Sequence, residues 1–189
     1  MRKVALSLAL SLTAMTSSIT SLSASAEVVV KMDTSAGVIE LTLDDAKAPI
    51  TVANFVDYAR AGHYDGLVFH RVIPGFMIQG GGMDADLQPR ETKAPIQNES
   101  NNGLSNRRGT ISMARTNAPN SATSQFFINT VDNPSLDGRG SRPGYAVFGE
   151  VTSGMEVVDS ISAVETTSVG YFRDVPKQPI LINSVSIAD

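Results

Sequence analysis

The chain has 189 residues, contains no cysteine, and carries 15 basic against 19 acidic side chains, a formal net charge of −4. Binding of nucleic acid depends on clustered positive charge, so this acidic balance argues against a nucleic-acid partner. The absence of cysteine excludes disulfides and the common zinc sites that use thiolate ligands.

The first 26 residues have the three-part organisation of a secretory signal peptide. Arg2 and Lys3 precede the apolar run Val4–Met15, and a small, polar stretch ends at Ala24–Ala26. This order predicts cleavage after Ala26. The apolar run has about a dozen residues, whereas a membrane-spanning helix needs roughly 20, so a membrane anchor is disfavoured.

Cleavage would leave residues 27–189, which we expect to form one domain. Without Arg2 and Lys3 the chain has 13 basic and 19 acidic residues, a net charge of −6. No later stretch is apolar enough to span a membrane, so no membrane association is expected after cleavage. The bacterial style of the signal favours the periplasm as destination, with secretion outside the cell second; a eukaryotic secretory route stays open.

Two strands and a helix are predicted at the start of the mature chain. The β-rich runs Val28–Met32 and Val38–Leu43 flank the turn-forming segment Asp33–Gly37, which is typical of a hairpin. The second run alternates, and its predicted core face is Ile39, Leu41 and Leu43. A helix is predicted over 49–59, because Pro49 suits a first turn and apolar residues recur at helical spacing.

Short strands dominate the remaining pattern, with a second helix predicted at Gly154–Ala163. The further predicted strands are Leu67–Ile73, Phe76–Gln79, Thr110–Ala114, Gln125–Thr130, Tyr145–Val151 and Ile180–Ile187. Many short strands with turn residues between them indicate a mainly β chain, folded as a closed antiparallel barrel or as a sandwich. The Gly- and Asn-rich segment Gly80–Gly109 has little regular pattern, and such long loops are usually functional or disordered.

The residue inventory excludes several common catalytic sites. His63 and His70 are the only histidines, too few for a zinc site of common spacing, and no G-x-S-x-G elbow is present. His70 lies inside an apolar run, which favours a structural role. Gly80–Gly82 lacks the later glycines and the lysine of a phosphate-binding loop and is interpreted as a flexible turn. We therefore expect neither a metal nor a cofactor.

The segment Phe69–Gly81 (FHRVIPGFMIQGG) resembles the signature of the cyclophilin family of prolyl isomerases. Four later segments resemble the family's further motifs, in the family's order: Gly109–Ala114, Ser124–Ile128, Leu136–Gly138 and Val147–Gly149. The resemblance covers essentially all of residues 27–189 and is greatest to periplasmic bacterial cyclophilins. It implies a closed eight-stranded antiparallel β-barrel capped by two α-helices.

The resemblance also implies a function, peptidyl-prolyl cis–trans isomerisation of proline-containing polypeptides, such as exported proteins that are folding. The alternative is a non-catalytic peptide-binding chaperone or interaction module that uses the same surface. Neither a heptad repeat nor a long apolar helix face indicates an obligate dimer, so we expect a monomer.

Specific residues receive roles through the same resemblance. It implies a catalytic set of Arg71, Phe76 and Gln79. The further substrate-binding residues that it implies are Met77, Ala114, Arg115, Gln125, Phe127, Leu136 and Tyr145. Within this set, the socket for the proline ring is assigned to Phe76, Met77, Phe127 and Leu136. Ser135 stands where the best-known eukaryotic members often carry a tryptophan, so weak inhibition by cyclosporin is expected.

Alternation along the strand 76–79 predicts the orientation of part of this set. It puts Met77 and Gln79 on one face of the strand and Phe76 on the other. A bend at Pro74–Gly75 would remove Phe76 from this alternation.

An arginine suits this reaction on physical grounds. Rotation about the Xaa–Pro bond breaks amide resonance, a barrier of about 18–20 kcal/mol, and leaves a lone pair on the prolyl nitrogen. A hydrogen bond from the charged guanidinium of Arg71 to that nitrogen would favour the twisted state over both planar states. A hundred-thousandfold acceleration requires roughly 7 kcal/mol, whereas one charge-assisted hydrogen bond contributes about 1.5–3 kcal/mol. The remainder must come from a preorganised, water-poor site.

Overall fold

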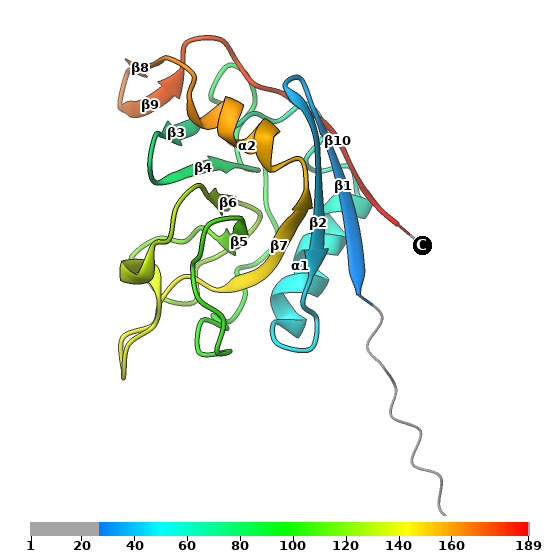
Figure 1. Ribbon diagram of the computed structural model, residues 1–189, viewed down its shortest axis with the longest axis vertical. Helices are drawn as coiled ribbons and strands as arrows, with labels where there is room; N and C mark the ends of the chain where they lie inside the picture. Colours follow the sequence, from blue (N-terminus) through cyan, green and yellow to red (C-terminus); the bar gives the residue numbers. More distant parts are fainter. Residues whose placement is uncertain (1–26, 189) are drawn as a thin grey trace, which may run out of the picture.

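The computed structural model describes residues 27–188, so the predicted signal peptide at 1–26 lies outside the described residues. Its elements in chain order are β1 (Val28–Thr34), β2 (Gly37–Leu43), α1 (Pro49–Arg60), β3 (Arg71–Ile73), β4 (Met77–Gly80), β5 (Thr110–Met113), β6 (Phe126–Asn129), the 3₁₀ turn η1 (Pro134–Leu136), β7 (Val147–Ser153), α2 (Met155–Ser162), β8 (Thr166–Val169), β9 (Phe172–Pro176) and β10 (Ile182–Ile187) (Figure 1).

Eight of the strands form one sheet in the order β10-β1-β2-β7-β5-β6-β4-β3, and every pair is antiparallel. The sheet curls until its two edges meet through the segments that precede β3 and β10. There Val68 forms a β-bridge with Leu181, and the Phe69 N–H donates to the Ile180 carbonyl at 3.0 Å. The predicted eight-stranded antiparallel barrel is confirmed, although it closes through this short bridge rather than through a ladder between β3 and β10.

Side-chain alternation along the strands fills the barrel. On β2, Ile39, Leu41 and Leu43 are each at most 1 % exposed, as predicted for the core face of this strand. Helix α1 packs against β10, whereas α2 packs against β2, β3 and β4, so the helices cover different parts of the barrel (Figure 1). Within the described residues, no helix has the length and hydropathy needed to cross a membrane.

Aromatic rings join α1 to the sheet. Phe55 of α1 stacks on Tyr64 with ring centroids 5.0 Å apart, and it contacts Phe126 of β6 and Phe148 of β7 at 5.7 and 5.4 Å. All four residues are completely buried. This cluster packs on the inner side of β6 and β7. Aromatic contacts of this kind stabilise a fold beyond the effect of their buried area.

One carboxylate of the long loop at 80–109 binds the first turn of α1. The two oxygens of Glu99 accept hydrogen bonds from the N–H groups of Ile50 and Thr51 at 3.1 and 2.8 Å. These N–H groups lie in the first turn of the helix, where they have no intrahelical partner, and Pro49 begins that turn. The loop is therefore held by specific side-chain hydrogen bonds rather than by regular secondary structure.

The structure differs from the predicted elements in two respects. Only Arg71–Ile73 of the predicted strand at 67–73 belongs to the sheet ladder, because the preceding residues form the closing bridge to the β10 side. The β8–β9 hairpin is not among the predicted elements. Its strands are short, polar and mostly exposed, so they show no alternation of apolar residues.

His70 precedes β3 and is 6 % exposed, which agrees with its predicted structural position. Its pKa is lowered from 6.5 to about 4, mainly because burial penalises the charged imidazolium. A hydrogen bond with the Val68 backbone raises the pKa, and the charge of Arg71 lowers it. His70 is therefore neutral in the folded protein near pH 7.

Stability is expected to fall as the pH decreases from about 6.5 to about 4, because the unfolded chain binds a proton that folded His70 does not. A difference of this size between the two pKa values corresponds to about 3 kcal/mol. We predict that the unfolding free energy of the His70→Leu variant, measured by urea denaturation, falls by less between pH 7 and pH 4.5 than that of the natural chain. Equal losses in both proteins would contradict this role of His70.

Candidate active site

The outer face of the sheet carries a row of paired residues. Arg71 of β3 lies opposite Gln79 of β4, and Gln79 lies opposite Phe127 of β6. Phe127 in turn lies opposite Ser112 of β5. Directly opposed residues point to the same side of a sheet, so these side chains form one row. The neighbouring row points into the core and is fully buried: Val72, Ile78, Ile128 and Ile111.

Met77 extends this row into an apolar floor. It lies two residues from Gln79 and therefore shares its side of β4, as predicted. Met77 and Phe127 are only 2 and 4 % exposed, whereas Arg71 and Gln79 are half-buried. We call the surface formed by Arg71, Met77, Gln79 and Phe127 the Arg71 face. It combines a permanent cation, an amide and an apolar floor on one side of the sheet.

Phe76 lies outside the strand in which it was predicted. The chain turns at Pro74–Phe76, Gly75 has a φ of +69°, and β4 begins at Met77. Only a residue without a β-carbon adopts this backbone conformation easily. The sequence left a bend at Pro74–Gly75 open, and the structure has one, so half-buried Phe76 does not follow the alternation of β4.

Gln79 is connected to a second amide. Its Nε2 donates to Oε1 of Gln125 at 2.9 Å, and the Gln125 carbonyl accepts from the N–H of Ala114 at 3.0 Å. A β-carbon at Gly82 would lie 2.4 Å from Cγ of Gln125, so a larger residue there would displace the side chain that bonds Gln79. The chain bends at Gly81 and Gly82 directly after β4, as predicted for a turn after a strand, and both glycines are buried.

Tyr145 and Arg115 form a wall beside Phe127. The Tyr145 ring meets Phe127 edge-on with centroids 5.6 Å apart, and the Arg115 guanidinium lies 4.6 Å from the centre of the Tyr145 ring. Arg115 also donates to the carbonyls of Pro143 and Gly144 at 2.9 and 3.0 Å. Its donors are thus engaged in holding the segment before Tyr145, and its role as a substrate contact stays a prediction.

Leu136 is joined to Tyr145 of this wall by a backbone hydrogen bond. It ends η1, is half-buried, and its carbonyl accepts from the Tyr145 N–H at 2.9 Å. The two segments are pressed together, since a β-carbon at Gly144 would lie 2.3 Å from the backbone nitrogen of Gly138. Through these contacts Leu136, Tyr145 and Arg115 lie around Phe127 of the Arg71 face, and the roles assigned to them stay predictions.

A chain of buried amides on the same side of the sheet as the Arg71 face was not predicted, since Asn129 lies opposite Met77. Asn133 donates to the carbonyl of Phe76 at 2.9 Å and to Oδ1 of Asn129 at 2.8 Å. Asn129 donates to Oδ1 of Asn106 at 3.3 Å, and Asn106 donates to Asp137 at 2.8 Å. We call Asn106, Asn129, Asn133 and Asp137 the amide chain. It joins the Phe76 turn to the residue after Leu136.

Asp137 ends the amide chain as a carboxylate. Partial burial raises its pKa, but hydrogen bonds from Ser105 and from both the backbone and side chain of Asn106 outweigh that effect. The charge of Arg139 acts in the same direction, and the net result is a pKa below the ordinary value of 3.8. Asp137 is therefore an ionised acceptor at neutral pH.

Among the described residues Arg71 has one ionic partner, which sequence reasoning also missed. Its Nε lies 3.6 Å from Oδ2 of Asp174 in β9, and the two side chains are 44 and 41 % exposed. No pattern in the sequence indicates Asp174, because β9 is a short, exposed strand. The Asn and Asp residues of the amide chain are likewise recognisable only from their burial.

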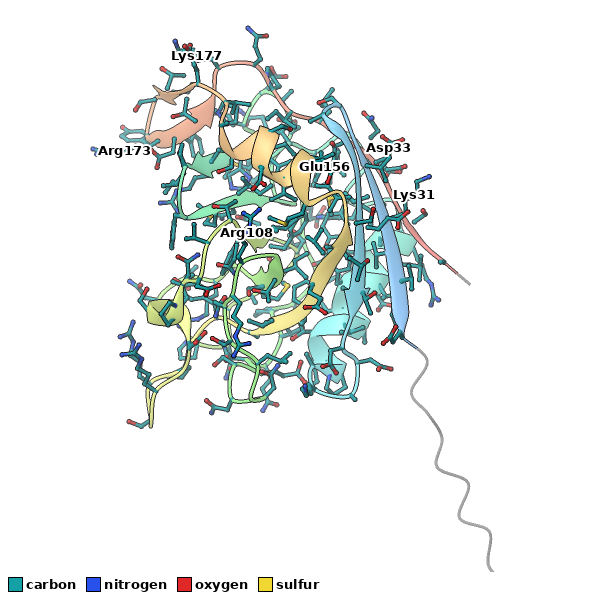
Figure 2. The ribbon with its side chains drawn as sticks, in the orientation of Figure 1. Lys31, Asp33, Arg108, Glu156, Arg173 and Lys177 are labelled. Carbon is teal, nitrogen blue, oxygen red and sulfur yellow. The ribbon has the colours of Figure 1, made fainter. Side chains whose placement is uncertain are left out.

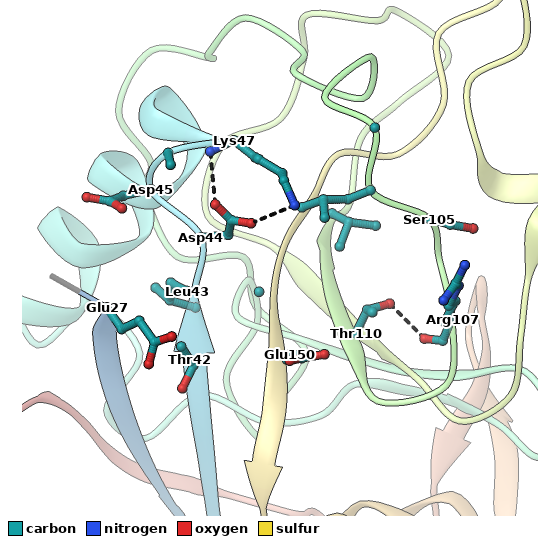
Figure 3. A pocket seen from close by; sticks show the side chains of 15 residues that line it. Glu27, Thr42, Leu43, Asp44, Asp45, Lys47, Ser105, Arg107, Thr110 and Glu150 are labelled. Carbon is teal, nitrogen blue, oxygen red and sulfur yellow. Dashed lines mark hydrogen bonds and ion pairs between the residues drawn. The ribbon is translucent and has the colours of Figure 1, made fainter. Parts of the chain in front are cut away.

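The structure also has cavities away from the Arg71 face. One of about 530 Å³ is lined by parts of β2 and β7 and by the loop before β5, and there Lys47 pairs with Asp44 at 3.4 Å (Figure 3). None of the predicted site residues lines it. Across the part of the chain that the structure describes, no group of three or more His, Asp or Glu could hold a metal ion.

We predict that Asn106→Ala lowers the unfolding free energy by about 1–3 kcal/mol, because it removes one hydrogen bond each from Asp137, Asn129 and fully buried Ser112. The measurement is urea denaturation at pH 7. Asn117→Ala is the matched control, since Asn117 is exposed and its removal should leave stability unchanged. Similar stabilities for both variants would show that the amide chain is unimportant.

Comparisons with known proteins agree with this geometry. The sequence model of the family described as "Cyclophilin type peptidyl-prolyl cis-trans isomerase/CLD" matches residues 29–187. "Peptidyl-prolyl cis-trans isomerase A" of Dickeya dadantii is 59 % identical over 159 residues, which cover 84 % of this chain and 83 % of that protein. "Peptidyl-prolyl cis-trans isomerase B" of Escherichia coli is 52 % identical over 164 residues, covering 85 % of this chain and all of the other.

Solved structures show the same architecture. A cyclophilin type peptidyl-prolyl cis-trans isomerase of Cryptosporidium parvum has a TM-score of 0.72 and 26 % identity, covering 86 % of this chain and 98 % of the other. A second structure of that protein was determined in the presence of the dipeptide Ala-Pro. From the matched family, the identity to its relatives and the shared fold, the chain belongs to the cyclophilin-type peptidyl-prolyl cis–trans isomerases.

Proposed function

We propose that this chain catalyses rotation about Xaa–Pro peptide bonds at the Arg71 face and thereby assists the folding of exported proteins. The observation that carries the proposal is the row Arg71–Gln79–Phe127, which places a cation, an amide and an aromatic ring side by side across three paired strands. These are the groups needed to hold a prolyl peptide and stabilise its twisted bond.

The apolar floor suits the prolyl ring. Met77 and Phe127 are almost completely buried and do not belong to the barrel core, so their small exposed parts offer an apolar surface on the outer face. Leu136 and Tyr145 border this surface through their mutual backbone hydrogen bond. Burying the ring there fixes its position while the bond before it rotates.

Gln79 is suited to hold a backbone carbonyl of the substrate. A glutamine amide has two N–H donors, and one of them is used in the hydrogen bond to Gln125. The other remains for the peptide, while the bond to Gln125 limits how the Gln79 side chain can rotate. The substrate is thereby held on one side of the bond that rotates.

Arg71 supplies the interaction that differs between the planar and twisted states. In both planar states the prolyl nitrogen shares its lone pair with the carbonyl and accepts a hydrogen bond poorly. In the twisted state the lone pair is localised, and a donor from the guanidinium stabilises it. Because this bond accounts for only part of the acceleration, the held, water-poor geometry supplies the remainder.

We predict that Arg71→Ala lowers kcat/KM by about 10- to 150-fold, equivalent to the 1.5–3 kcal/mol of one charge-assisted hydrogen bond. The measurement is NMR exchange spectroscopy of an end-blocked Ala-Pro peptide. Arg60→Ala removes the same charge from the exposed end of α1 and should leave the rate unchanged. Equal rates for the natural chain and Arg71→Ala would refute the mechanism.

The same peptide distinguishes catalysis from simple binding. A non-catalytic chaperone or interaction module would bind the peptide without accelerating exchange, and Arg71→Ala would then alter only affinity. A poised cation opposite Gln79 favours catalysis, because a binding module has no need for a donor directed at the prolyl nitrogen.

Export to the periplasm, with secretion as the second choice, is part of the proposal and is supported by the signal-like residues 1–26. Expression in a Gram-negative bacterium followed by fractionation and N-terminal sequencing tests it. A periplasmic chain that begins at Glu27 is expected, whereas a cytoplasmic chain that begins at Met1 would overturn it.

A further inference from the structure

The β8–β9 hairpin lies against the strand that carries Arg71. Figure 1 shows β9 beside β3, and the two strands are in contact. The hairpin turns at Gly170–Tyr171 and is largely exposed, with Arg173 of β9 pointing away from the barrel (Figure 2). The hairpin adds no strand to the barrel sheet, and Val175 and Pro176 of β9 are its only buried residues.

A β-bulge determines which β9 side chain faces Arg71. Thr167 pairs with Val175, and Val169 pairs with Phe172, so a single residue of β8 lies opposite two residues of β9. The second of these two is Asp174, which has a φ of 60°. A bulge of this kind redirects a side chain that regular alternation would place elsewhere, and bulges are frequent next to active sites.

The backbone of Asp174 is unusual for its residue type. Among the described non-glycine residues, only Leu87 and Asp174 have a positive φ. The left-handed conformation costs an L-residue conformational energy, and Asp and Asn tolerate it better than most. Such strained positions gather at functional sites, where the local conformation serves the site.

At its nearest approach, the carboxylate of Asp174 meets the guanidinium at Nε. Oδ2 of Asp174 lies 3.6 Å from Nε of Arg71, whereas neither terminal nitrogen of Arg71 donates a hydrogen bond within the part of the chain that is described. The carboxylate therefore restrains the guanidinium and leaves its terminal donors for a substrate. An exposed ion pair contributes modestly to stability, but this pair restricts the rotation of a long, flexible side chain.

We propose that Asp174 is a positioning residue, which holds the Arg71 guanidinium through Nε so that its terminal N–H groups point toward the prolyl nitrogen. The proposal rests on the function proposed for Arg71. Asp174 acts through Arg71 and does not touch the substrate. Asp174 should therefore affect the rate at which the bound peptide isomerises and have little effect on peptide affinity.

Asp174→Asn is the suitable variant, because Asn keeps the size of the side chain and tolerates the left-handed backbone. We expect kcat to fall by about 2- to 5-fold with KM little changed, the range that corresponds to one exposed ion pair. Glu165→Gln is the matched control. Glu165 pairs with Lys177 at 2.7 Å in the same hairpin, so this variant removes an equal charge without affecting Arg71. Its rate should equal that of the natural chain.

Two further measurements separate positioning from a structural effect. In an Arg71→Ala background, Asp174→Asn should cause no additional loss, since there is no guanidinium left to position. In about 1 M salt, where the Debye length is about 3 Å, the difference between the natural chain and Asp174→Asn should shrink for an uncharged peptide. The same fold loss in both backgrounds would overturn the proposal.

A third measurement does not depend on catalysis. The NMR order parameter of the Arg71 Nε–Hε group in the free protein should decrease in Asp174→Asn and stay unchanged in Glu165→Gln. If Arg71→Ala is fully active, the proposed function fails, while the order parameter still reports whether Asp174 restrains Arg71. An unchanged order parameter, or a faster rate in Asp174→Asn because the carboxylate had masked Arg71, would refute positioning.

Discussion

The hydrogen bonds of Asn106 are the constraint on which the geometry of the site depends. Asn106 is 1 % exposed, accepts from Ser112 and Asn129, and donates to Asp137. Buried polar groups of this kind are costly when unpaired, so each one restricts where its partners can lie. Through Asn129 and Asn133 the restriction extends to the Phe76 turn, and through Asp137 it extends to the segment of Leu136. Two loops that are distant in sequence are thereby held in register with the strands between them.

The sheet separates stability from chemistry by its two faces. One row of side chains across β3, β4, β6 and β5 fills the core, and the adjacent row forms the Arg71 face. A substitution on the outer row can therefore change the chemistry without opening a cavity in the core. This arrangement also explains why Met77 and Phe127 are nearly buried yet lie outside the main core cluster, since their side chains point to the outer side of the sheet.

The strength of the Arg71 charge at the site depends on whether a peptide is bound. The Arg71 side chain is 44 % exposed in the free protein, and water screens its charge there. A bound peptide would displace that water over an apolar floor, and the interaction of the guanidinium with the prolyl nitrogen would strengthen as the local dielectric constant falls. The ion pair between Asp174 and Arg71 is compatible with this picture, because the guanidinium would interact strongly with a peptide only after that water is displaced.

The sequence by itself determined the β-rich class, the two helices and the inward face of β2, because these follow from local periodicity and turn chemistry. Its motif resemblance also indicated the family and the residues around Arg71. Only the tertiary structure decided how the barrel closes through Val68 and Leu181, why Gly82 must approach Gln125, and which buried amides support the site. It alone placed Asp174 beside Arg71. These features depend on pairing between segments far apart in the chain, and local propensity carries no information about such pairing.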